Sequence, residues 1–98
     1  YLHVVDHSAM GSPKPDDALI NGMREAFGGT FIVVGNFDAA RAEAALSSKR
    51  GELAAFGRPF ISNPNLVTKL RTGEAFAPDD VKTFYSPGPV GYIDYPTN

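Results

Sequence analysis

The sequence predicts an α/β fold with about three consecutive βα units, a parallel sheet and an extended C-terminal segment. Two short apolar runs, Leu2–Val5 and Phe31–Val34, are nearly continuous and rich in β-branched residues, as in strands that are buried on both faces. Helical patterns with recognisable ends follow them. Strand starts near residues 2, 31 and 53 leave room for helical crossovers between parallel strands. The pattern fits an open doubly wound sheet or an arc of an eight-fold βα barrel.

The first helix is predicted between a capping aspartate and a glycine pair. Asp16 or Asp17 can cap its N-terminus, and Gly28-Gly29 would end it. Gly22, inside the helix, costs up to ~1 kcal/mol relative to alanine. Its apolar positions are Leu19, Ile20, Met23 and Phe27.

The second helix is predicted to have Asp38 as its N-cap, to run over Ala39–Arg50 and to end at Gly51. Its apolar stripe consists of Ala42, Ala45 and Leu46. A third strand is expected over Leu53–Phe56. Alanine is a poor strand former, so this strand is predicted mainly from the regular alternation of strands and helices before it.

A third helix is predicted with Asn63 as its N-cap and Pro64 at its first position, where a missing N–H costs nothing. Its inward-facing residues would be Leu66, Val67 and Leu70, and Gly73 would end it. These three units together occupy residues 1–73.

Residues 74–98 hold four of the eight prolines and show little apolar periodicity. We therefore expect an extended segment of the same domain, with one short helical turn near residues 78–81. Four aromatic residues are expected to form a cluster that anchors this segment or borders a substrate pocket. They are Phe84, Tyr85, Tyr92 and Tyr95.

Composition and charge argue against several classes of function. Nine basic residues against eleven acidic ones give a net charge of −2, which provides no electrostatic footprint for nucleic acid or an anionic membrane surface. The absence of cysteine excludes disulfides, thiolate metal sites and a cysteine nucleophile. No apolar run reaches the ~18 residues of a membrane span, and a cytoplasmic location is the default expectation.

Glycines follow two predicted strands at their carboxyl ends, where α/β folds place ligand sites. Gly35-Asn36 follows the second strand, and Gly57-Arg58 follows the third. Glycine lets a ligand approach main-chain N–H groups, a neighbouring helix N-terminus favours an anion, and arginine suits a phosphate. Ordinary turn glycines with a surface arginine are the alternative, but the pair of loops favours a phosphate site.

Other polar residues are interpreted as structural. His3 alternates with apolar neighbours and is expected in the core, whereas His7 follows Asp6 at a strand end and would point toward any site there. No third ligand of suitable spacing follows, so no metal site is predicted. The aspartates at 16–17 and 79–80 are interpreted as helix caps. Four basic residues suit the dipole at helix C-termini, namely Lys49, Arg50, Lys69 and Arg71.

Three stretches are specific in combination. They are AFGRPFISNPNL at 55–66, TFY at 83–85 and GYIDYPT at 91–97. Together they closely resemble the C-terminal part of the old yellow enzyme family, the FMN-dependent ene reductases that include N-ethylmaleimide and xenobiotic reductases. Residues 35–37 are similar to the phosphate loop after that family's seventh strand, and residues 1–6 to its sixth strand. The resemblance covers essentially the whole chain.

The resemblance implies the last three βα units of a TIM (β/α)8 barrel, with FMN at the carboxyl ends of the strands. NAD(P)H would reduce the flavin, which would pass hydride to a small activated alkene. The FMN phosphate would be bound by Gly35, Asn36, Gly57 and Arg58. Tyr85 and Phe84 would border the substrate pocket.

The family's carbonyl-binding pair, tyrosine proton donor and flavin-ring contacts lie in segments that the printed sequence lacks, so no catalytic residue is assigned. Residues 6–8 read Asp-His-Ser, where the family commonly has glutamate–proline–arginine. Two alternatives stay open. One is a non-catalytic phosphate- or nucleotide-binding barrel fragment. The other is a phosphate-binding aldolase or isomerase, for which Asp6 is the strand-end candidate.

The sequence opens inside a predicted strand, so we expect it to be a piece of a longer chain. The isolated piece is then expected to bind FMN poorly, because nothing in it encloses the flavin ring. It is also expected to self-associate through its open strand edges.

Overall fold

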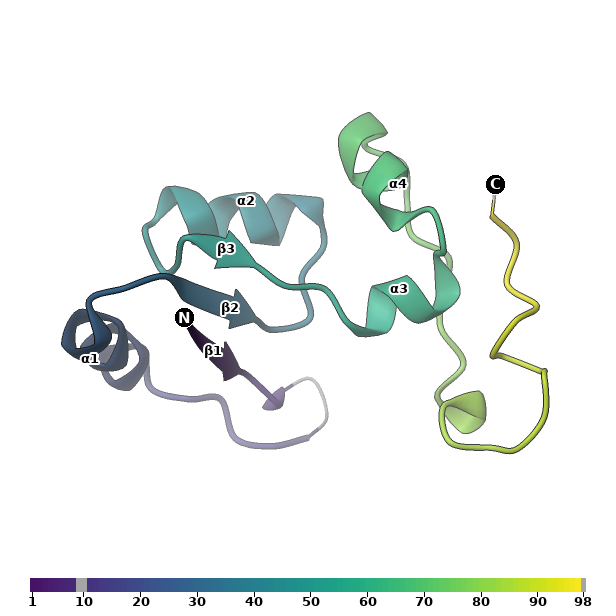
Figure 1. Cartoon of the computed structure of the whole chain (residues 1–98), viewed down its shortest axis with the longest axis horizontal. Coiled ribbons are helices and arrows are strands. Elements are labelled where there is room, and N and C mark those ends of the chain that lie inside the picture. Colours follow the sequence, from purple (N-terminus) through teal and green to yellow (C-terminus); the bar gives the residue numbers. More distant parts are fainter. Residues whose placement is uncertain (9–10, 98) are drawn as a thin grey trace. The chain divides into compact units, whose positions relative to one another are not determined.

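The structure is a computed structural model that describes residues 1–8 and 11–97. In chain order its elements are β1 (Leu2–Val5), α1 (Asp17–Phe27), β2 (Phe31–Val34), α2 (Ala39–Ser47), β3 (Leu53–Ala54), α3 (Arg58–Ser62), α4 (Leu66–Thr72) and the 3-10 turn η2 (Val81–Thr83) (Figure 1). The strands form a parallel sheet in the order β1-β2-β3. The predicted α/β alternation is confirmed. The chain divides into two compact units, Tyr1–Ala55 and Phe56–Asn98.

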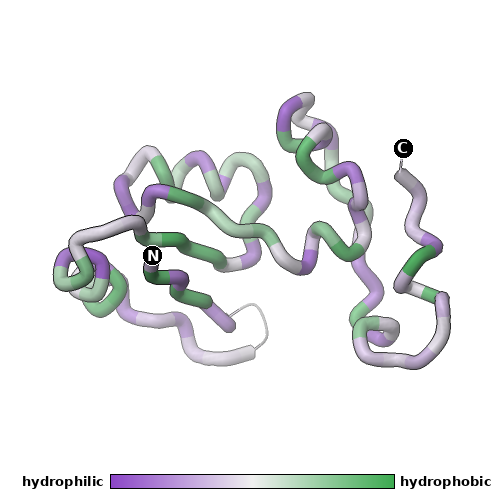
Figure 2. The backbone as a smooth tube through the Cα atoms, viewed as in Figure 1, coloured by the Kyte–Doolittle hydropathy of each residue, from purple (hydrophilic) through white to green (hydrophobic). Residues whose placement is uncertain are grey.

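A small core lies between the sheet and the two helices of the first unit. Phe31 and Val33 are 0% and 9% exposed, and Ala45 of α2 packs with them. Further apolar side chains from β1, from α1 and from the segment after β2 pack against this cluster, namely Leu2, Val4, Ile20, Met23 and Phe37. Alternate strand residues share a face, so α1 and α2 cover the same face of the sheet. The strands are the most hydrophobic stretches of this unit (Figure 2).

The other face of the sheet carries the alternate residues of β1. His3 is exposed there, and Val5 is 48% exposed. The prediction that His3 is packed in the core is therefore wrong, because both helices of this unit cover the face that carries Leu2 and Val4.

The predicted ends of α1 are confirmed. The Asp16 carboxylate accepts a hydrogen bond from the Ala18 main-chain N–H at 2.9 Å, and Gly28, with a φ of 71°, ends the helix in the left-handed conformation. The apolar stripe is narrower than the sequence suggests. Leu19 and Phe27 are 60% and 44% exposed.

The predicted C-terminus of α2 is wrong, because the helix ends at Ser47 and not at Arg50. Lys49 has a φ of 60°, and the Arg50 N–H donates to the Ala45 carbonyl at 3.0 Å, which closes the helix end without a glycine. Gly51 has a different role. A Cβ at this position would lie 2.9 Å from the Phe31 carbonyl oxygen, so the chain passes too close to β2 for any side chain.

We expect Gly51→Ala to lower the free energy of unfolding by about 1–3 kcal/mol, because the methyl group overpacks against backbone that cannot move aside. Gly22→Ala is the matched control. Gly22 lies inside α1, and a Cβ there would meet nothing within 4 Å. This variant should raise the stability by up to about 1 kcal/mol. Urea unfolding of both variants measures the difference, and equal effects would contradict the close approach at Gly51.

The second unit departs most from the prediction. β3 ends at Ala54, and the chain then enters α3, which the sequence pattern does not predict. α4 begins at Leu66 with Asn65 at its N-cap, so Asn63 is not the cap. Gly73, with a φ of 77°, ends α4 as predicted. Val67 is 56% exposed and does not face inward, whereas Leu66 is fully buried.

The C-terminal segment contains the expected short helical turn, η2, with Asp80 as its cap. The expected aromatic cluster does not form. Tyr85 and Tyr92 are 97% and 82% exposed, whereas the Tyr95 hydroxyl accepts a hydrogen bond from the Asp80 N–H at 3.1 Å. In the part of the chain that the structure describes, no helix combines the length and the apolar character that crossing a membrane requires.

Candidate functional site

The turn after β2 offers two main-chain donors. Asn36 has a φ of 52°, in the left-handed region that asparagine tolerates better than most residues. Within residues 1–8 and 11–97, the N–H groups of Gly35 and Asn36 have no hydrogen-bond acceptor. Unpaired N–H groups in such a turn can bind an anion. This turn therefore fits the predicted phosphate role.

The helix that follows this turn does not add to an anion site. The Asp38 carboxylate accepts a hydrogen bond from the Arg41 N–H at 2.8 Å, and the Arg41 guanidinium binds the same carboxylate at 3.2 Å. These hydrogen bonds, the main-chain one first, lower the pKa of Asp38 below its ordinary value of 3.8. A charged carboxylate thus already caps α2. We therefore assign no phosphate-binding group to the N-terminus of this helix.

Arg58, the first residue of α3, has an arrangement that suits an external anion. Its guanidinium carbon lies 5.4 Å from the centre of the Phe84 ring, and its Nε lies 3.9 Å from an Asp79 oxygen. That Nε is buried and has no hydrogen-bond partner among the described residues. A buried donor without an acceptor is unfavourable, and a phosphate oxygen would satisfy it. Beside it, Gly57 leaves open space where a Cβ would stand.

A buried polar network holds the surroundings of Arg58, and its centre is Asn63, which is fully buried. The Asn63 amide donates to the Pro59 carbonyl at 2.8 Å, and its oxygen accepts from the Ala77 N–H at 2.7 Å. The same oxygen accepts from the Lys69 ammonium at 2.8 Å. Lys69 does lie in the last turn of α4, as predicted, but it is only 9% exposed. The network joins α3 and α4 to the segment that leads to Asp79 and Phe84.

The family-like stretch at 91–97 forms a tight turn. Gly91 has a φ of 74°, and its N–H donates to the Asp94 carboxylate at 2.7 Å. A Cβ at Gly91 would collide with the side chain of Thr83. The turn places Tyr95, which binds the N-cap residue of η2 through its hydroxyl. The positive φ and the close approach explain why a glycine begins this stretch.

Asp6, the strand-end carboxylate, is held by its neighbour. Its oxygen accepts a hydrogen bond from the Ser8 N–H at 2.8 Å. Hydrogen bonds from the Ser8 hydroxyl and N–H lower the pKa of Asp6 below its ordinary value of 3.8. Burial opposes them in part, and the charges of Lys14 and Arg50 make smaller lowering contributions. A lowered pKa makes this carboxylate a poor general acid at neutral pH and a weaker base than an ordinary aspartate.

The six predicted site residues lie in both units. Gly35 and Asn36 belong to the first unit. The other four belong to the second, namely Gly57, Arg58, Phe84 and Tyr85. Arg58 and Phe84 are in direct contact, whereas the Tyr85 side chain is almost fully exposed. Asn63, Asp79 and Lys69 are the residues that sequence reasoning did not assign to the setting of Arg58. The run FGRPFISNP gave no clear signal of this, because its asparagine also suits the helix cap predicted for it.

Comparisons with known proteins identify the family of the chain. The model of the NADH:flavin oxidoreductase / NADH oxidase family matches residues 4–76. The chain is 38% identical over 107 residues to 12-oxophytodienoate reductase 7 of Oryza sativa subsp. japonica, covering 98% of this chain and 27% of that protein. A solved structure of morphinone reductase superimposes with a TM-score of 0.87 at 40% identity, over all of this chain and 26% of the other.

A second morphinone reductase structure, in complex with tetrahydroNAD, superimposes with a TM-score of 0.83 at 40% identity and again covers the whole chain and 26% of the other. The chain thus spans about a quarter of the length of the relatives it matches. The match favours the flavoenzyme interpretation over an aldolase or isomerase. The chain belongs to the NADH:flavin oxidoreductase / NADH oxidase family, the old yellow enzyme family of FMN-dependent oxidoreductases.

Proposed function

We propose that this chain supplies phosphate-binding groups for FMN in an NAD(P)H-dependent ene reductase. The groups are the main-chain N–H donors of Gly35 and Asn36, the open backbone at Gly57, and the guanidinium of Arg58. The observation that carries the proposal is the buried Arg58 Nε, which has no hydrogen-bond partner among the described residues. Arginine binds phosphate through planar, charge-assisted hydrogen bonds, so a phosphate oxygen is a suitable partner.

When bound, FMN would accept hydride from NAD(P)H and pass it to an activated alkene. The residues of this chain would bind and orient its phosphate. Arg58 would offset the phosphate charge, and the Phe84 ring would hold the guanidinium plane in place through a cation–π contact. NAD(P)H as the reductant is supported by the relative that is bound to tetrahydroNAD.

Tyr85 remains our proposal for the border of the substrate pocket. Its side chain is 97% exposed, and so it is available to face a ligand. Phe84 remains a proposal for the same border, and it has a second proposed role in holding the Arg58 guanidinium, because its ring lies against Arg58. Self-association also remains a proposal. It is supported by the exposed face of the sheet at His3 and Val5 and by the outer edges of β1 and β3.

Flavin titration of the full 98-residue chain tests the proposal. Fluorescence quenching should show weak binding of FMN, weaker binding of riboflavin, and competition by inorganic phosphate for FMN alone. FMN and riboflavin share the ring system and differ in the phosphate. Equal affinities for the two flavins would therefore overturn the phosphate role. Binding of phosphate or a nucleotide as tight as that of FMN would instead favour the non-catalytic alternative.

A further inference from the structure

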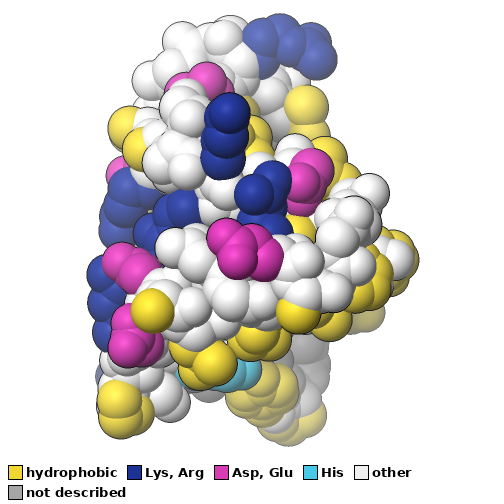
Figure 3. All heavy atoms as spheres, turned by 90° about the vertical axis from the view of Figure 1, so that its left-hand side faces the viewer, with side chains coloured by type: hydrophobic (Ala, Val, Ile, Leu, Met, Phe, Trp, Pro, Cys, Tyr) yellow, Lys and Arg dark blue, Asp and Glu magenta, His cyan; other side chains and the backbone are white. Residues whose placement is uncertain are grey.

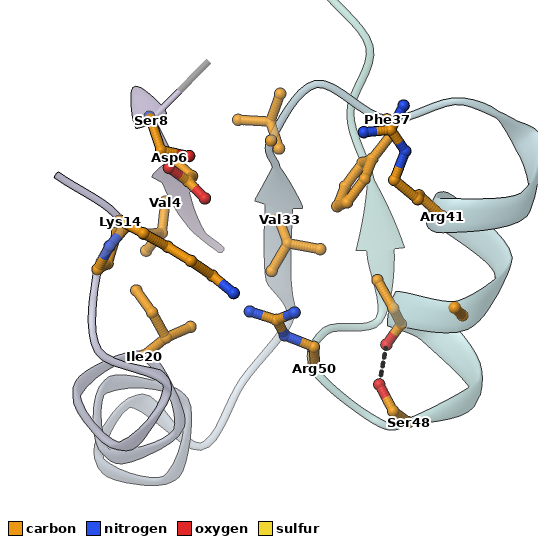
Figure 4. Close-up of a pocket in the computed structure, with 15 residues that line it drawn as sticks. Val4, Asp6, Ser8, Lys14, Ile20, Val33, Phe37, Arg41, Ser48 and Arg50 are labelled. Atoms are coloured by element: carbon orange, nitrogen blue, oxygen red, sulfur yellow. Dashed lines mark hydrogen bonds between the residues drawn. The ribbon is translucent and has the colours of Figure 1, made fainter. Parts of the chain in front are cut away.

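The pair of Arg58 and Asp79 differs from the other ion pairs of the described residues. Three arginines of the first unit are hydrogen-bonded to their carboxylate partners, in the pairs Arg24–Glu52, Arg41–Asp38 and Arg50–Asp17. Acidic side chains accordingly lie among the basic ones on the surface seen from the side of α1 (Figure 3). Arg41 and Arg50 line a pocket of about 500 Å³ (Figure 4), and their aspartate partners balance both charges. These arginines are therefore satisfied within the chain.

The Asp79 carboxylate, by contrast, brings a negative charge to Arg58 without a hydrogen bond. Its oxygen lies 3.9 Å from the Arg58 Nε, which is too far for a hydrogen bond. Asp80, and not Asp79, caps η2. Within residues 1–8 and 11–97, the Asp79 carboxylate accepts no hydrogen bond from any group. No capping role in this part of the chain therefore explains why a carboxylate stands beside Arg58.

Other contacts hold the two side chains near each other. The buried Asn63 side chain accepts a hydrogen bond from the Ala77 N–H at 2.7 Å and donates one to the Ala77 carbonyl at 3.1 Å, which fixes the chain two residues before Asp79. The Phe84 ring lies 5.4 Å from the guanidinium carbon of Arg58. Loss of the Asp79 charge should therefore leave the guanidinium in its position.

A phosphate bound to Arg58 would lie close to this carboxylate. A hydrogen bond from Nε places the phosphate oxygen ~3 Å away, so that oxygen would lie at most about 7 Å from the Asp79 oxygen. This separation is shorter than the Debye length of ~8 Å at physiological ionic strength, so salt screens the repulsion between the two negative groups only in part. Both groups also compete for the single positive charge of Arg58. The Asp79 carboxylate therefore opposes phosphate binding.

We propose that Asp79 is a specificity-determining residue of the phosphate site, which limits the negative charge that the site accepts. This inference rests on the proposed phosphate role of Arg58. A phosphate monoester carries a charge of about −1.5 to −2 at neutral pH. A phosphodiester has lost one more ionisable oxygen and carries a single negative charge. Asp79 thus reduces the affinity for a monoester such as FMN more than the affinity for a diester.

Flavin titration of the whole chain with Asp79→Asn tests this inference, because asparagine keeps the shape of aspartate and removes its charge. FMN should bind about three- to fivefold more tightly, and riboflavin binding should not change, since the charge pair is partly exposed. Asp79→Ser, which also removes the charge, should give the same gain and serves if the first variant does not fold. Glu74→Gln is the control for net charge, since Glu74 is exposed and forms no ion pair with any described residue. It should change neither affinity.

Two further measurements separate charge from geometry. At 1 M salt the Debye length is about 3 Å, so most of the gain for FMN should disappear. In competition with FMN, methyl phosphate should gain more affinity from Asp79→Asn than dimethyl phosphate, which is the diester.

Three results would overturn the inference and leave the proposed function intact. They are FMN binding that does not tighten in Asp79→Asn, a gain that riboflavin or Glu74→Gln shares, and a gain that is undiminished at 1 M salt. Equal gains for methyl and dimethyl phosphate would also contradict the selection by charge. Equal affinities of the unmodified chain for FMN and riboflavin would instead overturn both this inference and the proposed function.

Discussion

Arg58→Ala should weaken FMN binding by tenfold to a hundredfold and leave riboflavin binding nearly unchanged. The substitution removes a charge-assisted contact to the phosphate worth roughly 1.5–3 kcal/mol, which corresponds to about that range of affinity. Riboflavin has no phosphate and therefore loses nothing. The prediction is tested by measuring the dissociation constants of FMN and riboflavin at one salt concentration and comparing how much each changes.

Two further variants sharpen this test. Arg58→Lys should restore only part of the loss, because an ammonium cannot present two parallel donors to a phosphate. Arg71→Ala provides the control for net charge, since Arg71 is an exposed arginine in the last turn of α4. It should change neither dissociation constant. Equal losses for FMN and riboflavin in Arg58→Ala would show that this arginine acts through stability and not through the phosphate.

Asn63→Ala should lower the free energy of unfolding by about 3 kcal/mol, because it leaves the buried Lys69 ammonium and the Ala77 N–H without their acceptor. The double variant Asn63→Ala/Lys69→Met should recover part of the loss, because it also removes the buried charge. Urea unfolding monitored by circular dichroism measures both variants.

Asn65→Ala is the matched control, because this asparagine caps α4 without a side-chain hydrogen bond and its side-chain oxygen is buried without a partner. The free energy of unfolding of the Asn65→Ala variant should therefore differ little from that of the unmodified chain. If Asn63→Ala is as stable as Asn65→Ala, then the network around Asn63 does not stabilise the second unit.

The elements that sequence reasoning located well are those fixed by local chemistry. β1 and β2 have the predicted bounds, because their β-branched, continuous apolar runs suit strands and little else. α1 has its predicted ends, because an aspartate and a glycine have strong terminal preferences. Sequence reasoning failed where one residue can play either of two structural roles. Asn63 can cap a helix, but here it is buried as the acceptor of Lys69.

Contacts between distant residues explain most of the remaining errors. The sequence pattern predicts Gly51 as a helix stop. In the structure a glycine is required there because the chain passes close to Phe31, twenty residues earlier in the sequence. The glycine and arginine pattern predicted the candidate phosphate residues themselves. The Asp38 cap of α2 was predicted, whereas the contact of Arg58 with Phe84 depends on side-chain placement, which the pattern does not contain.

The unpaired Nε of Arg58 also has a consequence for the dynamics of the second unit. A buried donor without an acceptor makes the ligand-free fold less stable there, so a phosphate that pairs with it binds the folded form in preference to the unfolded form. Cofactor binding and local unfolding are then thermodynamically linked. Amide hydrogen exchange in α3 should slow when FMN is present, so the cofactor would act as a structural ligand of the segment that binds it.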